Sequence, residues 1–239
     1  GIDSILVGDS LGNVMLGLGD TVSVTMEDMI HHGAAVARGT KNALVVVDMP
    51  FMSYQSSVHD AVVNAGRLMK EARANAVKLE GGVEVADRIR AIVDCQIPVC
   101  AHIGLTPQGI NALGGFKVQG KTADSARKLL EDAHAVEEAG AFAVVLEAIP
   151  AELAERVSAE LTIPTIGIGA GAGCDGQVLV NQDMLGMFHD FTPKFVRRFA
   201  EVGDVMLEAY RAYDAAVKDG SFPAAEHTYA APAGVLENL

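Results

Sequence analysis

The sequence is poor in aromatic and in basic residues. Tryptophan is absent, only 8 Phe and 4 Tyr occur among 239 residues, and 31 acidic residues outnumber 18 basic ones to give a net charge of -13. This excess of negative charge argues against a general binding surface for nucleic acids or anionic membranes, although a single lysine can still hold an anionic small molecule. We therefore expect neither nucleic acid nor membrane as a partner.

Cysteines and long apolar runs are also scarce. The three cysteines, Cys95, Cys100 and Cys174, are odd in number and form no C-x-x-C pair, which favours buried thiols in a reducing cytoplasm over a disulfide framework or a zinc site. No run approaches the ~18 apolar residues of a membrane span, and no basic segment followed by an apolar one indicates a signal peptide. The predicted location is cytoplasmic.

Half of the residues are hydrophobic, enough to bury a sizeable core. Short runs rich in Val, Ile, Leu and Ala lack a polar alternation, which is typical of parallel strands that are buried on both faces. Between several of these runs lie segments whose apolar residues have the three- and four-residue spacing of a helix. In one such segment Thr122 is a candidate N-cap, and Gly140 is a candidate for the end of the helix. Strands are predicted at residues 2–8, 43–48, 75–80, 97–103, 142–147, 163–168 and 177–181, and helices at 57–72, 82–94 and 122–140.

Alternating strands and helices predict an α/β fold with a parallel sheet. No linker divides the chain, so we expect one domain over residues 1–239, with about 228–239 as a loosely packed tail. A doubly wound open sheet and a (β/α)8 TIM barrel both remain possible. The barrel gathers all strand ends at one mouth; with seven strands here, its first strand and helix would be missing and that position vacant.

Polar residues stand at the ends of the apolar runs. Carboxylates that converge at one mouth repel one another unless a cation lies among them, and an all-oxygen set suits Mg2+. We therefore interpret Asp9, Asp48 and Glu80 as candidate metal ligands. The alternative is that these acids only cap helices or solvate loops.

Three further side chains belong to this group. Lys78 stands two residues before Glu80 and faces the same side of its strand, so it can neutralise an anionic substrate or form a plain ion pair. Glu147 is a candidate general base for a carbon acid, or else a cap. His102 is a candidate hydrogen-bond donor to substrate or acid–base group, unless it is a satisfied core histidine.

Two glycine-containing segments allow other interpretations. "TIGIGAGAG" (165–173) contains the minimal dinucleotide pattern G-x-G-x-x-A, but no helix and ribose-binding acid are recognisable after it, so a tight turn is favoured. The segment 105–122 is predicted to be a flexible lid or merely a long connection.

A series of segments resembles, in order, the ketopantoate hydroxymethyltransferase family. They are "ILVGDSLG", "VVDMPFMSY", "AVKLEGG", "AHIGLTPQ", "GGFKVQG", "LEAIPAELA", "IPTIGIGAG", "DGQVLVNQDMLG" and "FPAAEHTY". The resemblance implies a (β/α)8 barrel of the phosphoenolpyruvate/pyruvate superfamily. It also implies hydroxymethyl transfer from methylene-tetrahydrofolate to 3-methyl-2-oxobutanoate in pantothenate biosynthesis, Mg2+ as cofactor, and a homo-oligomer, a decamer in the family. The family has a further strand and helix before "GIDSILVGDS", which this sequence lacks.

The same resemblance implies roles for single residues. Asp9, Asp48 and Glu80 match the metal-associated acids, and Glu147 matches the proton acceptor. The implied keto-acid contacts are Asp9, Ser10, Asp48 and Lys78, with His102 as a further residue of the pocket. Two rivals are a phosphonomutase or carbon–carbon lyase of the same superfamily that uses no folate, and a non-catalytic nucleotide-binding protein.

Overall fold

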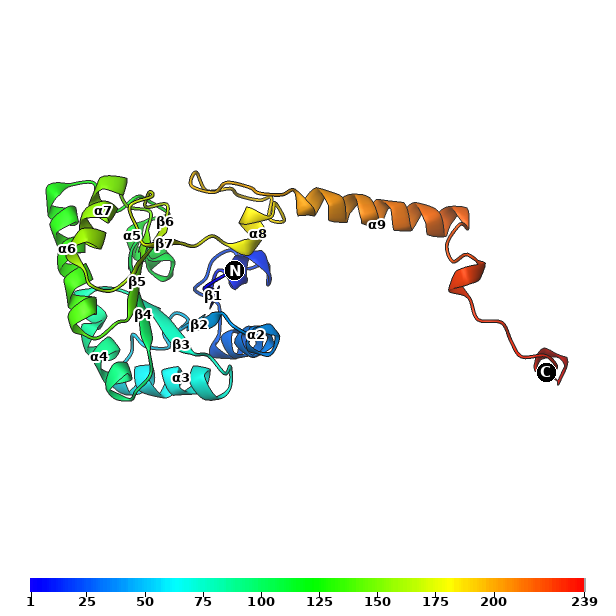
Figure 1. The fold of residues 1–239 in the computed structure, drawn as a ribbon, viewed down its shortest axis with the longest axis horizontal. Coiled ribbons are helices and arrows are strands. Elements are labelled where there is room, and N and C mark those ends of the chain that lie inside the picture. Colours follow the sequence, from blue (N-terminus) through cyan, green and yellow to red (C-terminus); the bar gives the residue numbers. More distant parts are fainter. Residues whose placement is uncertain (239) are drawn as a thin grey trace. The chain divides into compact units, whose positions relative to one another are not determined.

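Seven parallel strands form one sheet in the computed structural model, which describes residues 1–238. Each strand pairs with the next one along the chain, so the order in the sheet is β1 to β7 (Figure 1). The strands are β1 (Ser4–Val7), β2 (Leu44–Asp48), β3 (Ala76–Glu80), β4 (Val99–Gly104), β5 (Ala143–Glu147), β6 (Thr165–Ile168) and β7 (Gly176–Gln177).

This strand order decides between the two predicted architectures. A doubly wound sheet reverses its strand order at a switch point, whereas here the order is sequential throughout. Among the described residues, β1 and β7 each have a single neighbour in the sheet, so the sheet is open at both edges. The fold is α/β, and the prediction of a TIM-barrel type of sheet with seven strands is confirmed.

The last strand is shorter than predicted. We expected a strand over 177–181, but β7 contains only Gly176 and Gln177, and helix α8 (Asn181–Met184) already begins at the end of that range. Beyond β7, the amide of Val178 still donates to the carbonyl of Gly167. The apolar run "VLV" was therefore misread as a strand, because periodicity cannot distinguish a short buried strand from an apolar loop.

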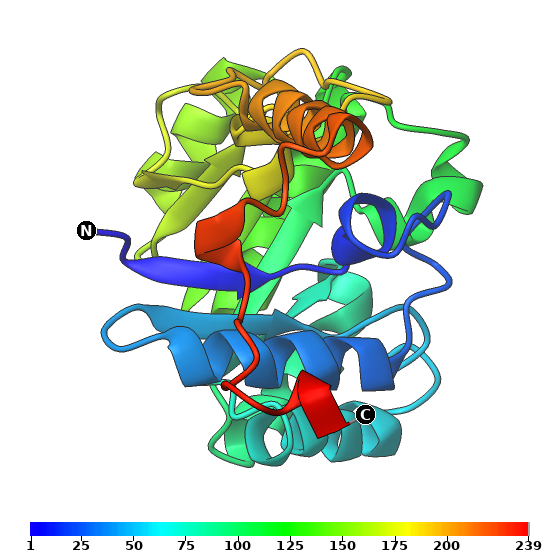
Figure 2. The ribbon, with the colours of Figure 1, turned by 90° about the vertical axis from the view of Figure 1, so that its right-hand side faces the viewer.

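Five helices of residues 1–180 lie against one face of the sheet. Figure 2 shows α2 alongside β2 next to β1, and α3, α4 and α6 contact β3, β4 and β5. The predicted cap of α6 is confirmed, since the Thr122 hydroxyl accepts from the amide of Ser125, and Gly140 follows the helix with φ +98°. The helices of this layer are α2 (Met26–Gly39), α3 (Val58–Lys70), α4 (Ala86–Asp94), α6 (Ala123–Glu138) and α7 (Ala151–Glu160); α1 (Leu11–Val14) and α5 (Ile110–Leu113) are single turns.

Side chains of the strands alternate between two faces, as strand geometry requires. In β3, Val77 and Leu79 belong to the large apolar core that includes Leu68 and Ile89 of the helices. On the opposite face of the sheet, a small cluster contains Val46, Ala76, Cys100, Ala143 and Val145. We call this second face the inner face, and the next residues along it, toward the carboxyl ends of the strands, are polar.

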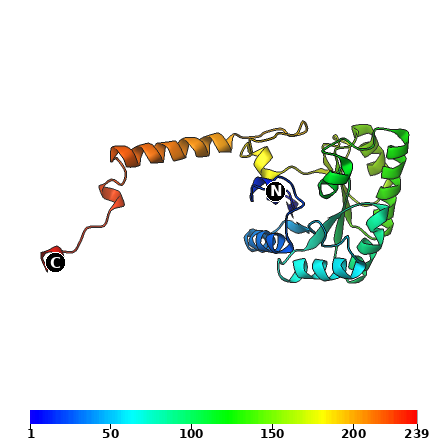
Figure 3. The same ribbon diagram turned by 180° about the vertical axis from the view of Figure 1, so that it is seen from behind.

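The chain divides into two compact units, of which residues 1–180 carry the whole sheet. The second unit begins at Asn181 and contains α8 and the long helix α9 (Val202–Asp219; Figure 3). The single domain and the loosely packed tail therefore stay predictions. No helix within residues 1–238 is long and apolar enough to cross a membrane.

Candidate active site

The polar residues of the inner face lie at the carboxyl ends of four adjacent strands. Asp48 of β2 is in register with Lys78 of β3, and Glu80 of β3 is in register with His102 of β4. Glu147 ends β5 opposite Gly104. Because parallel strands end at the same edge, the backbone alone places these five side chains in one row.

Asp9 joins this row from the end of β1. The backbone amide of Asp9 donates to Oδ2 of Asp48 at 2.9 Å, and Oδ1 of Asp48 lies 2.8 Å from Nζ of Lys78. All three side chains are almost completely buried, with exposed fractions of 3–4%. A buried ion pair of this kind needs further hydrogen bonds to offset its desolvation, and the Asp9 amide supplies one of them.

His102 links the other end of the row. Its Nδ1 lies 3.6 Å from Oε1 of Glu80 and 3.3 Å from Nζ of Lys78, and its Nε2 lies 3.1 Å from Oε2 of Glu147. The Glu147 side chain is 15% exposed, whereas that of His102 is 4% exposed. Glu147 is therefore the most accessible carboxylate of the row.

The backbone around Glu147 has a tight geometry. Gly104 has φ +96°, and a Cβ atom there would lie 2.4 Å from the Glu147 carbonyl oxygen, so only glycine fits. Ala148, the residue after Glu147, has φ +47°, a conformation that is uncommon for a residue with a side chain. The chain thus turns sharply directly after the candidate base.

Ser10 follows Asp9 at the start of α1. Within residues 1–238 its hydroxyl accepts no capping hydrogen bond, and a Cβ atom at Gly8 would approach its Oγ to 3.1 Å and Oδ2 of Asp48 to 3.5 Å. The hydroxyl therefore lies close to the carboxylates with its hydrogen-bonding capacity available. The structure thus brings together every site residue that the sequence predicted.

Two residues of the site were missed by the sequence analysis. Gln108, in the loop after β4, donates through Nε2 to Oδ2 of Asp9 at 2.8 Å and through its backbone amide to Oε2 of Glu80 at 3.0 Å. Tyr54, which is fully buried, donates to Oε1 of Gln108 at 2.7 Å. The available signals were a Gln after a Thr-Pro turn and the small number of tyrosines, four in the sequence. Neither signal predicts that the side chain points toward the carboxylates.

The electrostatics of the row are dominated by its carboxylates. Burial raises the pKa of Asp9 to about 8, helped by repulsion from Asp48 and Glu80. Burial alone would lower the pKa of Lys78, but attraction to Asp48, Glu80 and Asp9 outweighs it and leaves that pKa raised. Burial and Lys78 likewise lower the pKa of His102, yet hydrogen bonds to Glu147 and Glu80 bring it to about 9.

These residues fit a divalent cation by their chemistry. Four carboxylates face only two cationic groups. Burial raises the pKa of Asp9 most and repulsion from Asp48 and Glu80 raises it further, and a cation would relieve that repulsion. Oxygen ligands from Asp9, Asp48 and Glu80 are those that Mg2+ prefers. Within residues 1–238, no three His, Cys, Asp or Glu side chains converge closely enough to hold a metal as they stand.

The pKa values of Asp9 and His102 predict how stability depends on pH without metal. Both pKa values are higher in the folded protein than in an unfolded chain, so the folded protein binds more protons. The free energy of unfolding should fall as pH rises through 6.5 to 8, by up to roughly 1.4 kcal/mol per pH unit for each group. Urea unfolding in EDTA from pH 5.5 to 9 measures this.

Asp9→Asn serves as the control for that measurement. It removes one of the two titrating groups, so the fall in stability should become shallower below pH 8 and persist near pH 9, where His102 still titrates. A free energy of unfolding that rises between pH 6.5 and 8 in the parent protein would contradict the raised pKa values.

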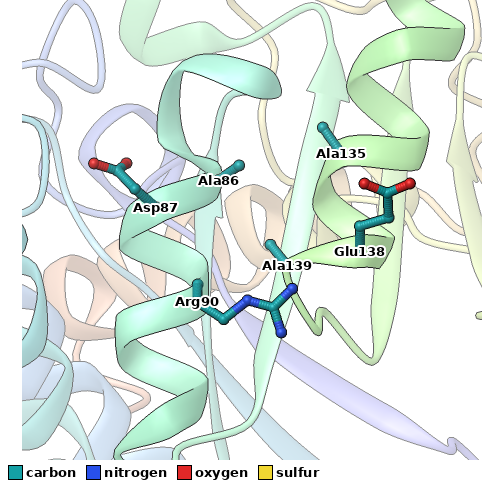
Figure 4. Close-up of a pocket in the computed structure, with 6 residues that line it drawn as sticks. All are labelled: Ala86, Asp87, Arg90, Ala135, Glu138 and Ala139. Carbon is teal, nitrogen blue, oxygen red and sulfur yellow. The ribbon is translucent and has the colours of Figure 1, made fainter.

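A cavity of about 300 Å³ lies elsewhere, between α4 and α6 (Figure 4). None of the site residues lines it, and it is shallow, with three alanines among its walls. Its lining consists of Ala86, Asp87, Arg90, Ala135, Glu138 and Ala139. We do not assign the reaction to it, because it offers neither a row of converging acids nor a buried lysine.

The glycine-rich segment after β6 forms a turn. Gly169 and Gly171 have φ +64° and +81°, and the chain continues into β7 without a helix. A dinucleotide fold needs a helix N-terminus at that point to hold the pyrophosphate. The interpretation as a turn is therefore confirmed, and the structure does not support a nucleotide-binding protein.

Comparisons with known proteins show the family of the chain. The family model for ketopantoate hydroxymethyltransferase matches residues 1–225. The 3-methyl-2-oxobutanoate hydroxymethyltransferases of Clostridium novyi and Enterococcus faecalis are each 66% identical over the whole chain, which spans 87% of their length. The protein of the same name from Clostridium acetobutylicum is 60% identical.

Two solved structures share the fold at low identity. Phosphonopyruvate hydrolase superposes with a TM-score of 0.57 at 15% identity, covering 99% of this chain and 82% of its own. Its complex with oxalate and Mg2+ gives a TM-score of 0.56 at 14% identity, covering 95% and 81%. Such identities show a common fold and no more, whereas the relatives at 60–66% identity are all transferases of one kind. The chain belongs to the ketopantoate hydroxymethyltransferase family.

Proposed function

We propose that the protein transfers a hydroxymethyl group from methylene-tetrahydrofolate to 3-methyl-2-oxobutanoate, forming ketopantoate for pantothenate biosynthesis. The observation that carries this proposal is the position of Glu147, an accessible carboxylate at the end of a row of buried acids with a buried lysine. Such a row can bind a small keto acid and place a base beside its C3 atom. Relatives of that name at 66% identity support the choice of substrate.

Asp9, Asp48 and Glu80 would hold Mg2+ together with the keto acid. When bound, the cation would withdraw electrons from the keto and carboxylate oxygens of the substrate and so favour loss of a proton from C3. The excess of carboxylates over cations in the row supports this assignment.

The residues of the chain supply the other steps. Lys78 offsets the negative charge of the keto acid, and the Ser10 hydroxyl, which caps nothing, donates to the substrate carboxylate. Glu147 accepts the C3 proton. Water releases the methylene carbon from both folate nitrogens at the oxidation level of formaldehyde and leaves tetrahydrofolate. The electron pair left on the substrate forms the new bond to that carbon, and the oxygen that came from water takes up a proton to become the hydroxyl. His102, whose Nε2 faces Glu147, orients that carboxylate and lines the substrate pocket.

The direct test is formation of ketopantoate from both substrates with Mg2+, followed by mass spectrometry. Omitting the folate should abolish product, as should EDTA. Product from the keto acid without any folate would favour a carbon–carbon lyase or mutase of the same superfamily instead.

Ser10→Ala should weaken substrate binding and leave the chemical step almost intact. It removes one hydrogen bond to a carboxylate, which is worth roughly 10-fold in affinity or more, while Glu147 and the acids stay in place. We expect KM for the keto acid to rise about 10-fold with kcat changed less than threefold. Ser56→Ala, on an exposed loop, is the control, and an unchanged KM for Ser10→Ala would remove Ser10 from the pocket.

We also propose that the protein acts in the cytoplasm as a homo-oligomer. The family resemblance supports both statements, and the absence of a helix that could span a membrane within residues 1–238 is consistent with the first. Sedimentation of the purified protein tests the second, and a monomer at micromolar concentration would contradict it.

A further inference from the structure

Gln108 has no assigned role, yet it contacts two of the three acids that the sequence predicted as metal ligands, Asp9 and Glu80. It lies in the short helical turn Pro107–Gly109 after β4 and is 4% exposed. Its Nε2 donates to Oδ2 of Asp9 at 2.8 Å and to the carbonyl of Met49 at 2.9 Å. Its Oε1 accepts from Tyr54 and Gln55, and its backbone amide donates to Glu80.

These contacts fix which way round the amide group lies. A glutamine amide has two donor hydrogens and two acceptor lone pairs, and here all four are used. The donors face a carboxylate and a carbonyl, which can only accept, while Oε1 faces the Gln55 amide nitrogen at 3.0 Å, which can only donate. If the amide were flipped, these hydrogen bonds would be lost, and Oε1 of Gln108 would face the oxygens of Asp9 and Met49.

The amide holds one oxygen of Asp9 and leaves the other available. Oδ2 of Asp9 accepts from Gln108, while within residues 1–238 its Oδ1 has no hydrogen-bond donor. The amide is neutral, so it orients the carboxylate without adding a positive charge beside it. A lysine or arginine in this place would add one. The side chain of Asp9 therefore keeps one oxygen to which a cation can bind.

The same residue connects separate strand ends. Asp9 follows β1, Met49 and Tyr54 follow β2, and Glu80 ends β3. A single residue of the loop after β4 therefore connects all three strand ends, through its side chain to the first two and through its backbone amide to Glu80. Tyr54 completes the arrangement, since its hydroxyl donates to Oε1 of Gln108 and accepts from the amide of Glu80 at 3.0 Å.

We propose that Gln108 is a positioning residue for the metal-binding acids: its side chain orients Asp9 and its backbone amide orients Glu80 for binding a divalent cation, and Tyr54 fixes the orientation of the Gln108 amide. This inference rests on the proposed function, because it takes Asp9 and Glu80 as ligands of that cation. Gln108 acts through these acids and need not touch the substrate.

The test measures binding of Mg2+ in the presence of 3-methyl-2-oxobutanoate by calorimetry. Gln108→Met keeps the length of the side chain but removes both donors, so we expect the affinity for Mg2+ to fall at least about 10-fold, the effect of one hydrogen bond to a charged group. Tyr54→Phe, a milder change that guards against misfolding of the first variant, should lower it by a smaller factor. Because the two residues act in series, the double variant should bind Mg2+ about as weakly as Gln108→Met alone.

Gln119→Met is the matched control. Gln119 lies in the same loop, and its side chain donates only to the carbonyl of Lys117, so its replacement should leave the affinity for Mg2+ unchanged. A purely structural role of Gln108 would lower the melting temperature of Gln108→Met while Mg2+ binding stayed at the parent value, and that result would overturn the proposal. Additive effects of Tyr54→Phe and Gln108→Met would overturn the link between them.

Failure of this inference is distinguishable from failure of the proposed function. A parent protein that binds Mg2+ and keto acid, but makes no ketopantoate with the folate, contradicts the proposed function alone. A Gln108→Met protein that binds Mg2+ like the parent contradicts the positioning role alone. A parent protein that binds no Mg2+ contradicts both.

Discussion

Glu147→Gln should reduce the exchange of the C3 hydrogen of 3-methyl-2-oxobutanoate with deuterated water by about 10²-fold or more, which is the usual contribution of a general base. The amide keeps the size of the side chain and can still pair with Nε2 of His102, but it cannot accept a proton from C3. Exchange needs no folate, so it isolates proton removal from the transfer step. Proton NMR of the keto acid, with Mg2+ present, follows the reaction directly.

The variant should bind Mg2+ and the keto acid nearly as the parent does, because neither Asp9 nor Asp48 contacts residue 147. Glu152→Gln, an exposed change in the first turn of α7, is the matched control and should exchange at the parent rate. If Glu147→Gln also exchanges at the parent rate, Glu147 is not the base, and His102, 3.1 Å away, becomes the next candidate.

The gathering of the site residues could be predicted because it depends only on the backbone. Asp48, Glu80 and Glu147 each end a strand, and Lys78 and His102 each lie two residues before a strand end. Parallel strands place such ends together whatever the loops do. The alternation within β3 also places Lys78 and Glu80 on one face, while Val77 and Leu79 enter the core. Local pattern and strand direction were sufficient for this part of the site.

The roles of Gln108 and Tyr54 could not be predicted, because they depend on the course of loops. Gln108 meets Asp9 across 99 positions of sequence, and it does so only because the turn after β4 folds over the strand ends. Neither residue has an unusual neighbour or spacing that would identify it. The length of β7 was wrong for a related reason, since a three-residue apolar run fits a strand or a loop equally well.

Asp48→Asn should weaken the joint binding of Mg2+ and 3-methyl-2-oxobutanoate by about 10²-fold or more, as expected when one partner of a buried charge pair is removed. Oδ2 of Asp48 accepts from the amide of Asp9, and Oδ1 forms an ion pair with Nζ of Lys78. An asparagine amide has only one oxygen, so in either orientation its NH2 group faces one of these two donors and that contact is lost. The change also removes a negative charge from the proposed ligand set and leaves Lys78 buried without its partner.

Two further variants separate binding from stability. Asp48→Asn should lower the melting temperature, because an unpaired buried lysine is costly, and Lys78→Met in the same chain should restore much of it. The double variant should nevertheless bind Mg2+ and keto acid no better than Asp48→Asn, since it still lacks the carboxylate and now lacks the lysine as well.

Asp124→Asn, at an exposed ion pair of α6, should leave binding unchanged. Calorimetry that found parent-like binding in Asp48→Asn would remove Asp48 from the ligand set, and recovery of binding in the double variant would show that Asp48 serves only to neutralise Lys78.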